Sequence, residues 1–258
     1  MANREHEVHK AASADAAILE LTICAYVVAE RAAGQLADCL INGGDGAAAV
    51  QQAERELDRL DRQVDSLVTA SIAEVAAEQA RELLGSMKMV LDLERIGDLL
   101  ASVASRAAAL GKYGLAADDA NDLIKMATVI EKMLGDANAA FTVRNLDRAT
   151  AVLRADAEVD RYRNLILIRQ LEMAQTNESR SAIHVVSMSQ ALERAGDHVK
   201  NLAEEICHLA TGRSVRHSFR DFDKPDEQMY LDYLRQRHGL AGDHSPQKRP
   251  TQPAGAGD

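Results

Sequence analysis

The chain of 258 residues lacks the side chains on which most other fold classes depend. It has no tryptophan, and aromatic residues make up only 3% of it, which argues against a β-sandwich built from aromatic and β-branched strands. All four prolines follow residue 224, so no proline interrupts a helix before that point. Because alanine, leucine, glutamate and arginine, which all favour helices, are abundant in this part, the sequence predicts an all-α protein.

Cysteine is also scarce, and its spacing argues against two kinds of site. Cys24, Cys39 and Cys207 are odd in number and form no CxxC motif, so we expect neither a disulfide framework nor a zinc site. Each cysteine lies among apolar residues of a helical pattern. We therefore expect three buried, unreactive thiols.

Basic charge and long apolar runs are missing as well. The 30 Lys and Arg against 40 Asp and Glu leave a net charge of −10, which argues against binding to nucleic acid or to an anionic membrane surface. The longest apolar run near the N-terminus covers residues 21–29, whereas a membrane-spanning helix needs about 20 residues. Since the first ten residues lack the apolar segment of a signal peptide, we expect a cytoplasmic protein that reaches a membrane only through partners.

Glycine, asparagine and aspartate interrupt the helical pattern and divide it into six long helices. Asp45 is expected to cap the second of them. The helices are expected at about residues 12–41, 46–77, 79–110, 118–143, 147–174 and 180–211. Residues 214–258 are expected to form a largely disordered C-terminal extension, with one short helix at about 225–238.

The six helices form two matching sets of three. LERIGD at 93–98 recurs as LERAGD at 192–197, with five of six residues identical at an offset of 99. A second stretch beginning at Asp45 matches one beginning at Asp147 at an offset of 102. Because matching elements occur in the same order, the sequence predicts an internal duplication that gives two tandem three-helix bundles. The bundles are expected over residues 1–113 and 114–213.

Pairs of acidic residues four positions apart lie at matched places in both halves. Such side chains lie one above the other on a helix, and two carboxylates there repel each other unless a cation compensates. A divalent or trivalent ion, such as Fe, Mn or Zn, supplies that charge, and without it we expect raised carboxyl pKa values. Gly97 and Gly196, inside otherwise strong helices, indicate a close approach of a second helix. The candidate metal ligands are Glu54, Asp58, Asp61, Asp65, Glu94, Asp98, Asp156, Asp160, Glu193 and Asp197.

The segments LERIGD at 93–98 and LERAGDHVKNLAEEICHLATG at 192–212 resemble the paired signatures of the PhoU family. The resemblance extends over about residues 12–213. It implies two three-helix bundles, multinuclear metal clusters held by E(D)xxxD motifs, and a cytoplasmic negative regulator of the phosphate response that is not an enzyme. It also implies contacts with the ATPase of the phosphate ABC transporter and with a sensor histidine kinase, and we expect a homodimer. Leu99 and Ser102 depart from the family pattern, in which histidine and asparagine are usual.

Two other functions stay open at this point. Glu205 and His208 form an ExxH pair, an element of ferritin-like di-metal oxidoreductases, but that architecture uses two such motifs and we find one here. A plain helical scaffold is the other alternative. If the protein is a metal-binding regulator, we expect two unequal sites. The first would be all-carboxylate, whereas the second could add a nitrogen ligand from His208 and hold a transition metal more tightly.

Overall fold

The computed structural model describes residues 2–111, 114–173 and 181–212, and within them the chain forms six α-helices and no β-strand. This confirms the all-α prediction. The helices are α1 (Ala2–Ile41), α2 (Ala47–Ser71), α3 (Ala77–Leu110), α4 (Ala117–Val143), α5 (Leu146–Met173) and α6 (Ala182–Thr211). No helix in this described part is long and apolar enough to cross a membrane. The expected C-terminal extension, residues 214–258, lies outside the described residues.

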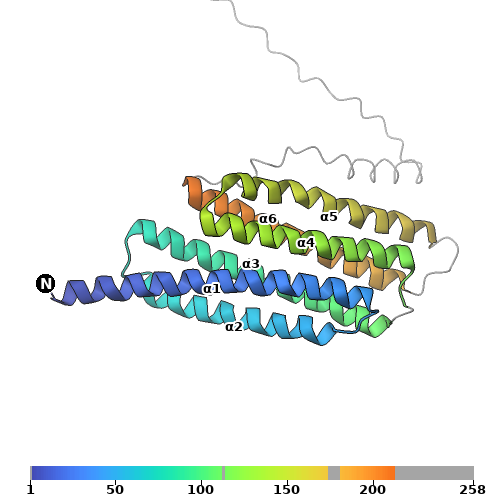
Figure 1. Ribbon diagram of the computed structural model, residues 1–258, viewed down its shortest axis with the longest axis horizontal. Coiled ribbons are helices and arrows are strands. Elements are labelled where there is room, and N and C mark those ends of the chain that lie inside the picture. Colours follow the sequence, from blue (N-terminus) through green and yellow to red (C-terminus); the bar gives the residue numbers. More distant parts are fainter. Residues whose placement is uncertain (1, 112–113, 174–180, 213–258) are drawn as a thin grey trace, which may run out of the picture.

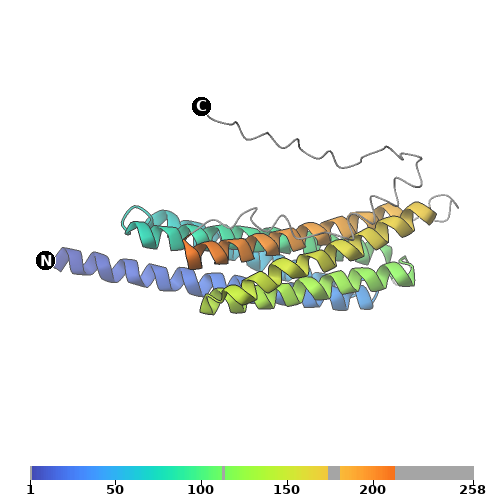
Figure 2. The same ribbon diagram turned by 90° about the horizontal axis from the view of Figure 1, so that it is seen from above.

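The helices pack as two three-helix bundles that lie side by side (Figure 1). α1, α2 and α3 contact one another, and α4, α5 and α6 do the same. Contacts of α1 with α4 and of α3 with α6 join the two sets. Figure 2, turned by 90°, shows that all six helices run roughly along the long axis of the molecule. The two repeats predicted from the sequence therefore appear as two neighbouring bundles.

One apolar core runs through both bundles. α2 illustrates how the sequence builds it, because its buried residues, such as Val50, Leu57 and Val68, recur on one side of the helix. Between the bundles, Tyr26 of α1 packs against Phe141 of α4 with their ring centroids 5.6 Å apart. The two repeats therefore bury part of their apolar surface against each other.

Several helix boundaries differ from the sequence prediction. α1 begins at Ala2, ten residues early, and α2 ends at Ser71, six residues early, in a turn where the N–H of Glu74 donates to the carbonyl of Ser71. Asp45 does not cap α2, since the N-cap is Gly46 with a φ of 95°. The glycines of this turn set its path: Gly44 also has a positive φ, and a Cβ there would come 2.4 Å from an α3 backbone atom.

Candidate metal centre

The first acidic cluster lies where α2 packs against α3. It comprises Glu54, Asp58, Asp61 and Asp65 of α2 and Glu94 and Asp98 of α3. Burial raises the pKa of Glu94, and the charge of Asp98 on the same helix raises it further. Asp61 and Asp58, across on α2, act on this pKa in the same direction. Glu94 of α3 therefore lies near Asp58 and Asp61 of α2.

The positive charge beside this cluster compensates it only in part. Burial raises the pKa of Asp61, and the charges of Asp65 and Asp58 add to the rise. Arg62 opposes it and donates a hydrogen bond to Asp58 over 2.7 Å, but the side chain of this arginine is 67% exposed. Solvent therefore screens much of its charge. The pKa values of Asp61 and Glu94 are therefore raised, and burial is a larger cause of both shifts than like charge.

Gly97 allows α2 and α3 to approach closely beside the first cluster. A Cβ at this position would lie 2.6 Å from Cδ1 of Leu57 and 3.6 Å from the Cα of Glu54. The predicted close approach is thus confirmed at Gly97. Its repeat partner Gly196 differs, because a Cβ there would meet Val159 only at 3.5 Å, which is ordinary van der Waals contact.

The second acidic cluster lies between α5 and α6 and already contains cations. It comprises Asp156 and Asp160 of α5, both buried, and Glu193 and Asp197 of α6. Lys200 donates to Asp156 over 2.8 Å, and Arg163 lies 3.6 Å from Glu193. Burial raises the pKa of Glu193, as do the neighbouring carboxylates, while Arg163 lowers it. Two carboxylates of this cluster are therefore paired with basic side chains of the protein itself.

In each cluster, candidate ligands from two neighbouring helices lie near one another, but they do not converge on one point. Within the described residues, no three His, Cys, Asp or Glu side chains are placed so that they could hold one metal ion. The carboxylate oxygens of the first cluster are nevertheless the donors that hard ions prefer. Metal binding thus stays a prediction, and it requires these side chains to turn from the positions that they have here.

Some expectations for single residues were wrong, and some contacts were missed. Cys39 and Cys207 are buried as expected, but Cys24 is exposed on α1. Nδ1 of His198 lies 2.7 Å from Oδ1 of Asp92, which links α6 to α3 across the two bundles. Sequence reasoning missed this contact because its two residues are 106 positions apart.

A second contact that the sequence did not reveal ties α4 to α5. Arg169 donates to the buried Asp119 and Asp122 over 2.5 and 2.6 Å, and Gln170 donates to Asp119 over 2.8 Å. Asp119 and Asp122 are three positions apart, which places them on one face of a helix. Only the packing of the helices shows that one arginine binds both. This network fixes the position of α5 against the start of α4 and lies apart from both acidic clusters.

Two copies of a three-helix unit, each with facing carboxylates between its second and third helix, define this chain as a duplicated helical-bundle protein. The PhoU domain matches residues 27–107 and 123–206, one match in each bundle. The chain belongs to the PhoU family.

Individual relatives agree with this assignment. The phosphate-specific transport system accessory protein PhoU homolog of Pseudomonas aeruginosa is 29% identical over 194 residues, which cover 73% of this chain and 80% of the relative. The homolog of Caulobacter vibrioides is 30% identical over 192 residues, which cover 71% of this chain and 84% of the relative.

Solved structures show the same fold. The crystal structure of PhoU from Pseudomonas aeruginosa matches with a TM-score of 0.66 and 26% identity, over 81% of this chain and 99% of its own. The phosphate transport system regulatory protein PhoU from Streptococcus pneumoniae matches with a TM-score of 0.71 and 20% identity, over 78% of this chain and 97% of its own. Both structures are matched almost whole, so this chain has residues beyond the shared fold.

Proposed function

We propose that this protein is a cytoplasmic, metal-binding regulator of phosphate uptake and of phosphate-responsive signalling, and not an enzyme. It would act as an adaptor between the ATPase of a phosphate ABC transporter and a sensor histidine kinase, as a homodimer. The observation that carries the proposal is the family match in both bundles. Relatives that match over most of their length are named accessory proteins of the phosphate-specific transport system.

The first acidic cluster is the better candidate for the metal. Burial and the repulsion of neighbouring carboxylates raise the pKa values of Glu94 and Asp61, and the nearest cation is an exposed arginine. A bound ion would neutralise this repulsion, with Glu54, Asp58, Asp61, Asp65, Glu94 and Asp98 as the ligands. The second cluster would first have to release Lys200 and Arg163 from its carboxylates. These ion pairs weigh against the tighter binding expected at the second site.

Metal analysis of purified protein tests this part of the proposal. Glu94→Gln with Asp61→Asn should reduce the bound Fe, Mn or Zn more than Glu193→Gln with Asp160→Asn does. The control is Glu158→Gln, because Glu158 is an exposed acid of α5 outside both clusters. Metal content that is unchanged in both double variants would show that these carboxylates do not bind metal.

Deletion of the gene tests the regulatory role. If the protein represses the phosphate response, its loss should raise alkaline phosphatase activity in cells grown in high phosphate. Complementation with the unaltered gene should restore repression, whereas Glu94→Gln/Asp61→Asn should restore it less well if the metal is needed. Normal repression in the deletion strain would contradict the regulatory proposal.

The contacts around the ExxH pair do not favour an oxidoreductase. Glu205, its glutamate, lies 3.4 Å from Lys88 of α3 in an ion pair between the bundles. This pairing gives Glu205 a role in holding α6 to α3. We therefore propose no catalytic function.

A further inference from the structure

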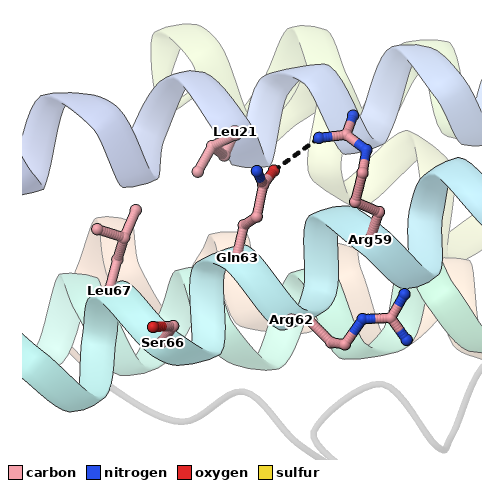
Figure 3. A pocket seen from close by; sticks show the side chains of 6 residues that line it. All are labelled: Leu21, Arg59, Arg62, Gln63, Ser66 and Leu67. Carbon is pink, nitrogen blue, oxygen red and sulfur yellow. Dashed lines mark hydrogen bonds between the residues drawn. The ribbon is translucent and has the colours of Figure 1, made fainter.

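A surface groove runs between α1 and α2, on the side of α2 that faces away from α3. It has a volume of about 450 Å³ and is lined by Leu21 of α1 and by Arg59, Arg62, Gln63, Ser66 and Leu67 of α2. Figure 3 shows the two leucines on one stretch of the groove and the two guanidinium groups farther along it. Arg59 donates to Gln63, a neutral partner, over 2.9 Å. Because Arg62 is paired with Asp58 of the first acidic cluster, the groove combines an apolar surface with the positive charge of Arg59.

The part of the chain beyond α6 contains a segment of matching chemistry. The family match ends at residue 206 and the described residues end at Gly212, which leaves 46 residues. Within them, residues 221–234 (DFDKPDEQMYLDYL) have five acids and one lysine, a net charge of 1 − 5 = −4. On the short helix expected at 225–238, Met229 and Tyr233 lie four positions apart and therefore on one side. We propose that residues 221–234 of this chain dock in the α1–α2 groove.

The end of α6 lies at the same level of the molecule as the groove. Leu209 of α6 packs over Gly85 near the start of α3, and Gly97 packs on Leu57 of α2. Because α2 and α3 are antiparallel neighbours, the level of Gly85, twelve residues before Gly97, corresponds to that of Thr69, two residues past the end of the groove at Leu67. Figure 1 agrees, since α6 ends at the end of the molecule where α3 begins.

The connecting residues are long enough to reach the groove. Residues 213–221 extend nine positions from Gly212, and an extended chain of that length spans up to about 30 Å. The route crosses α3 and α2, and packed helix axes are about 8–10 Å apart. The docked segment can therefore lie on the same copy of the chain that carries it.

The order of charges along the extension also complements the order of charges on the surface of α2. Residues 213–220 (RSVRHSFR) have three arginines and no acid, and they would cross α2 near Asp65, the member of the first acidic cluster at that end of the helix. On a helical wheel that starts at Glu54, the acids of α2 lie within roughly 40° of zero, with Arg62 at roughly 80° and Arg59 at roughly 140°. The surface of α2 thus changes from acidic to basic toward the groove, while the extension changes from basic to acidic. This complementarity makes the chain's own segment the occupant that we favour.

A distance measurement in the full chain tests the proposal without reference to metal or phosphate. Nitroxide labels are attached to Cys24, the exposed cysteine of α1, and to Gln228→Cys, which lies away from Met229 and Tyr233 on the expected helix, while Cys39 and Cys207 are buried. Docking predicts one narrow distance distribution by double electron–electron resonance. A broad distribution in the otherwise unaltered protein would overturn the proposal.

Charge variants identify the docking surface. Arg59→Glu and the milder Arg59→Gln should broaden the narrow distribution, with helix content checked by circular dichroism. Arg161→Glu is the matched control, because Arg161 is the exposed repeat partner of Arg59 on α5 and should leave the distribution narrow. A narrow distribution that survives Arg59→Glu would overturn the proposal by showing docking elsewhere. A signal that disappears on dilution with unlabelled chain would overturn it by showing that the segment binds a second copy.

Discussion

Replacing each of the two glycines of the repeated LER(I/A)GD motif by alanine should change the stability of the protein in opposite directions. Gly97 and Gly196 occupy the same place in the duplicated sequence, and both are buried inside a helix. At Gly196, a new Cβ would meet its nearest neighbours, Val159 and Asp156, at 3.5 and 3.6 Å, which is ordinary contact. At Gly97, it would lie 2.6 Å from Cδ1 of Leu57, so an atom has to move.

The magnitudes follow from helix propensity and packing. Alanine in place of glycine stabilises a helix interior by about 0.5–1 kcal/mol, and at Gly196 this gain should appear almost whole, as a rise in melting temperature of about 1–4 °C. At Gly97, overpacking costs about 1–3 kcal/mol, because Leu57 is 1% exposed and enclosed by the core. That cost exceeds the gain, so Gly97→Ala should lower the free energy of unfolding by up to about 2 kcal/mol.

Urea unfolding of metal-free protein, followed by circular dichroism, measures both effects. A double-mutant cycle isolates the cause: in a Leu57→Ala background the clash is removed, and Gly97→Ala should become stabilising. If Gly97→Ala lowers stability equally in both backgrounds, the clash with Leu57 is not the reason. If both single glycine variants stabilise the protein to the same extent, the inequality of the two helix contacts is refuted.

Three further predictions concern titration, the buried network and thiol exposure. Because the pKa of Glu94 is raised above its ordinary value of 4.5, the folded metal-free protein binds this proton more tightly than the unfolded chain. The contribution of Glu94 to the free energy of unfolding is therefore complete below pH 4.5 and is lost as the pH rises through the raised pKa. Urea titrations at several pH values should show a flatter decline for Glu94→Gln. Arg169→Gln leaves the buried Asp119 and Asp122 without their arginine and should lower the free energy of unfolding by about 3 kcal/mol, whereas Arg148→Gln on the exposed surface of α5 should change it little. In the native protein, Cys24 alone should react rapidly with Ellman's reagent, and Cys24→Ser should abolish that fast phase.

Local sequence determined the helices and the placement of acids along each of them. Helix propensity and the absence of proline before residue 225 act within a few positions of the chain, so they sufficed to predict six helices. The i, i+4 spacing placed Glu94 and Asp98 on one face of α3 for the same reason. The repeated motif predicted the internal duplication, and its resemblance to known signatures predicted the family. The end of α2 was predicted six residues late, because the turn after Ser71 contains no glycine or proline that would mark it in the sequence.

Only the tertiary structure decided which charges oppose one another. The spacing of Asp156 and Asp160 looks like that of Glu54 and Asp58, yet packing brings Lys200 onto Asp156 and leaves the first cluster with a solvent-exposed arginine. The α1–α2 groove likewise depends on a leucine and two arginines from different helices. Helical periodicity fixes the face on which a side chain lies, but its partner comes from another helix, tens of residues away, and is set by how the whole core packs.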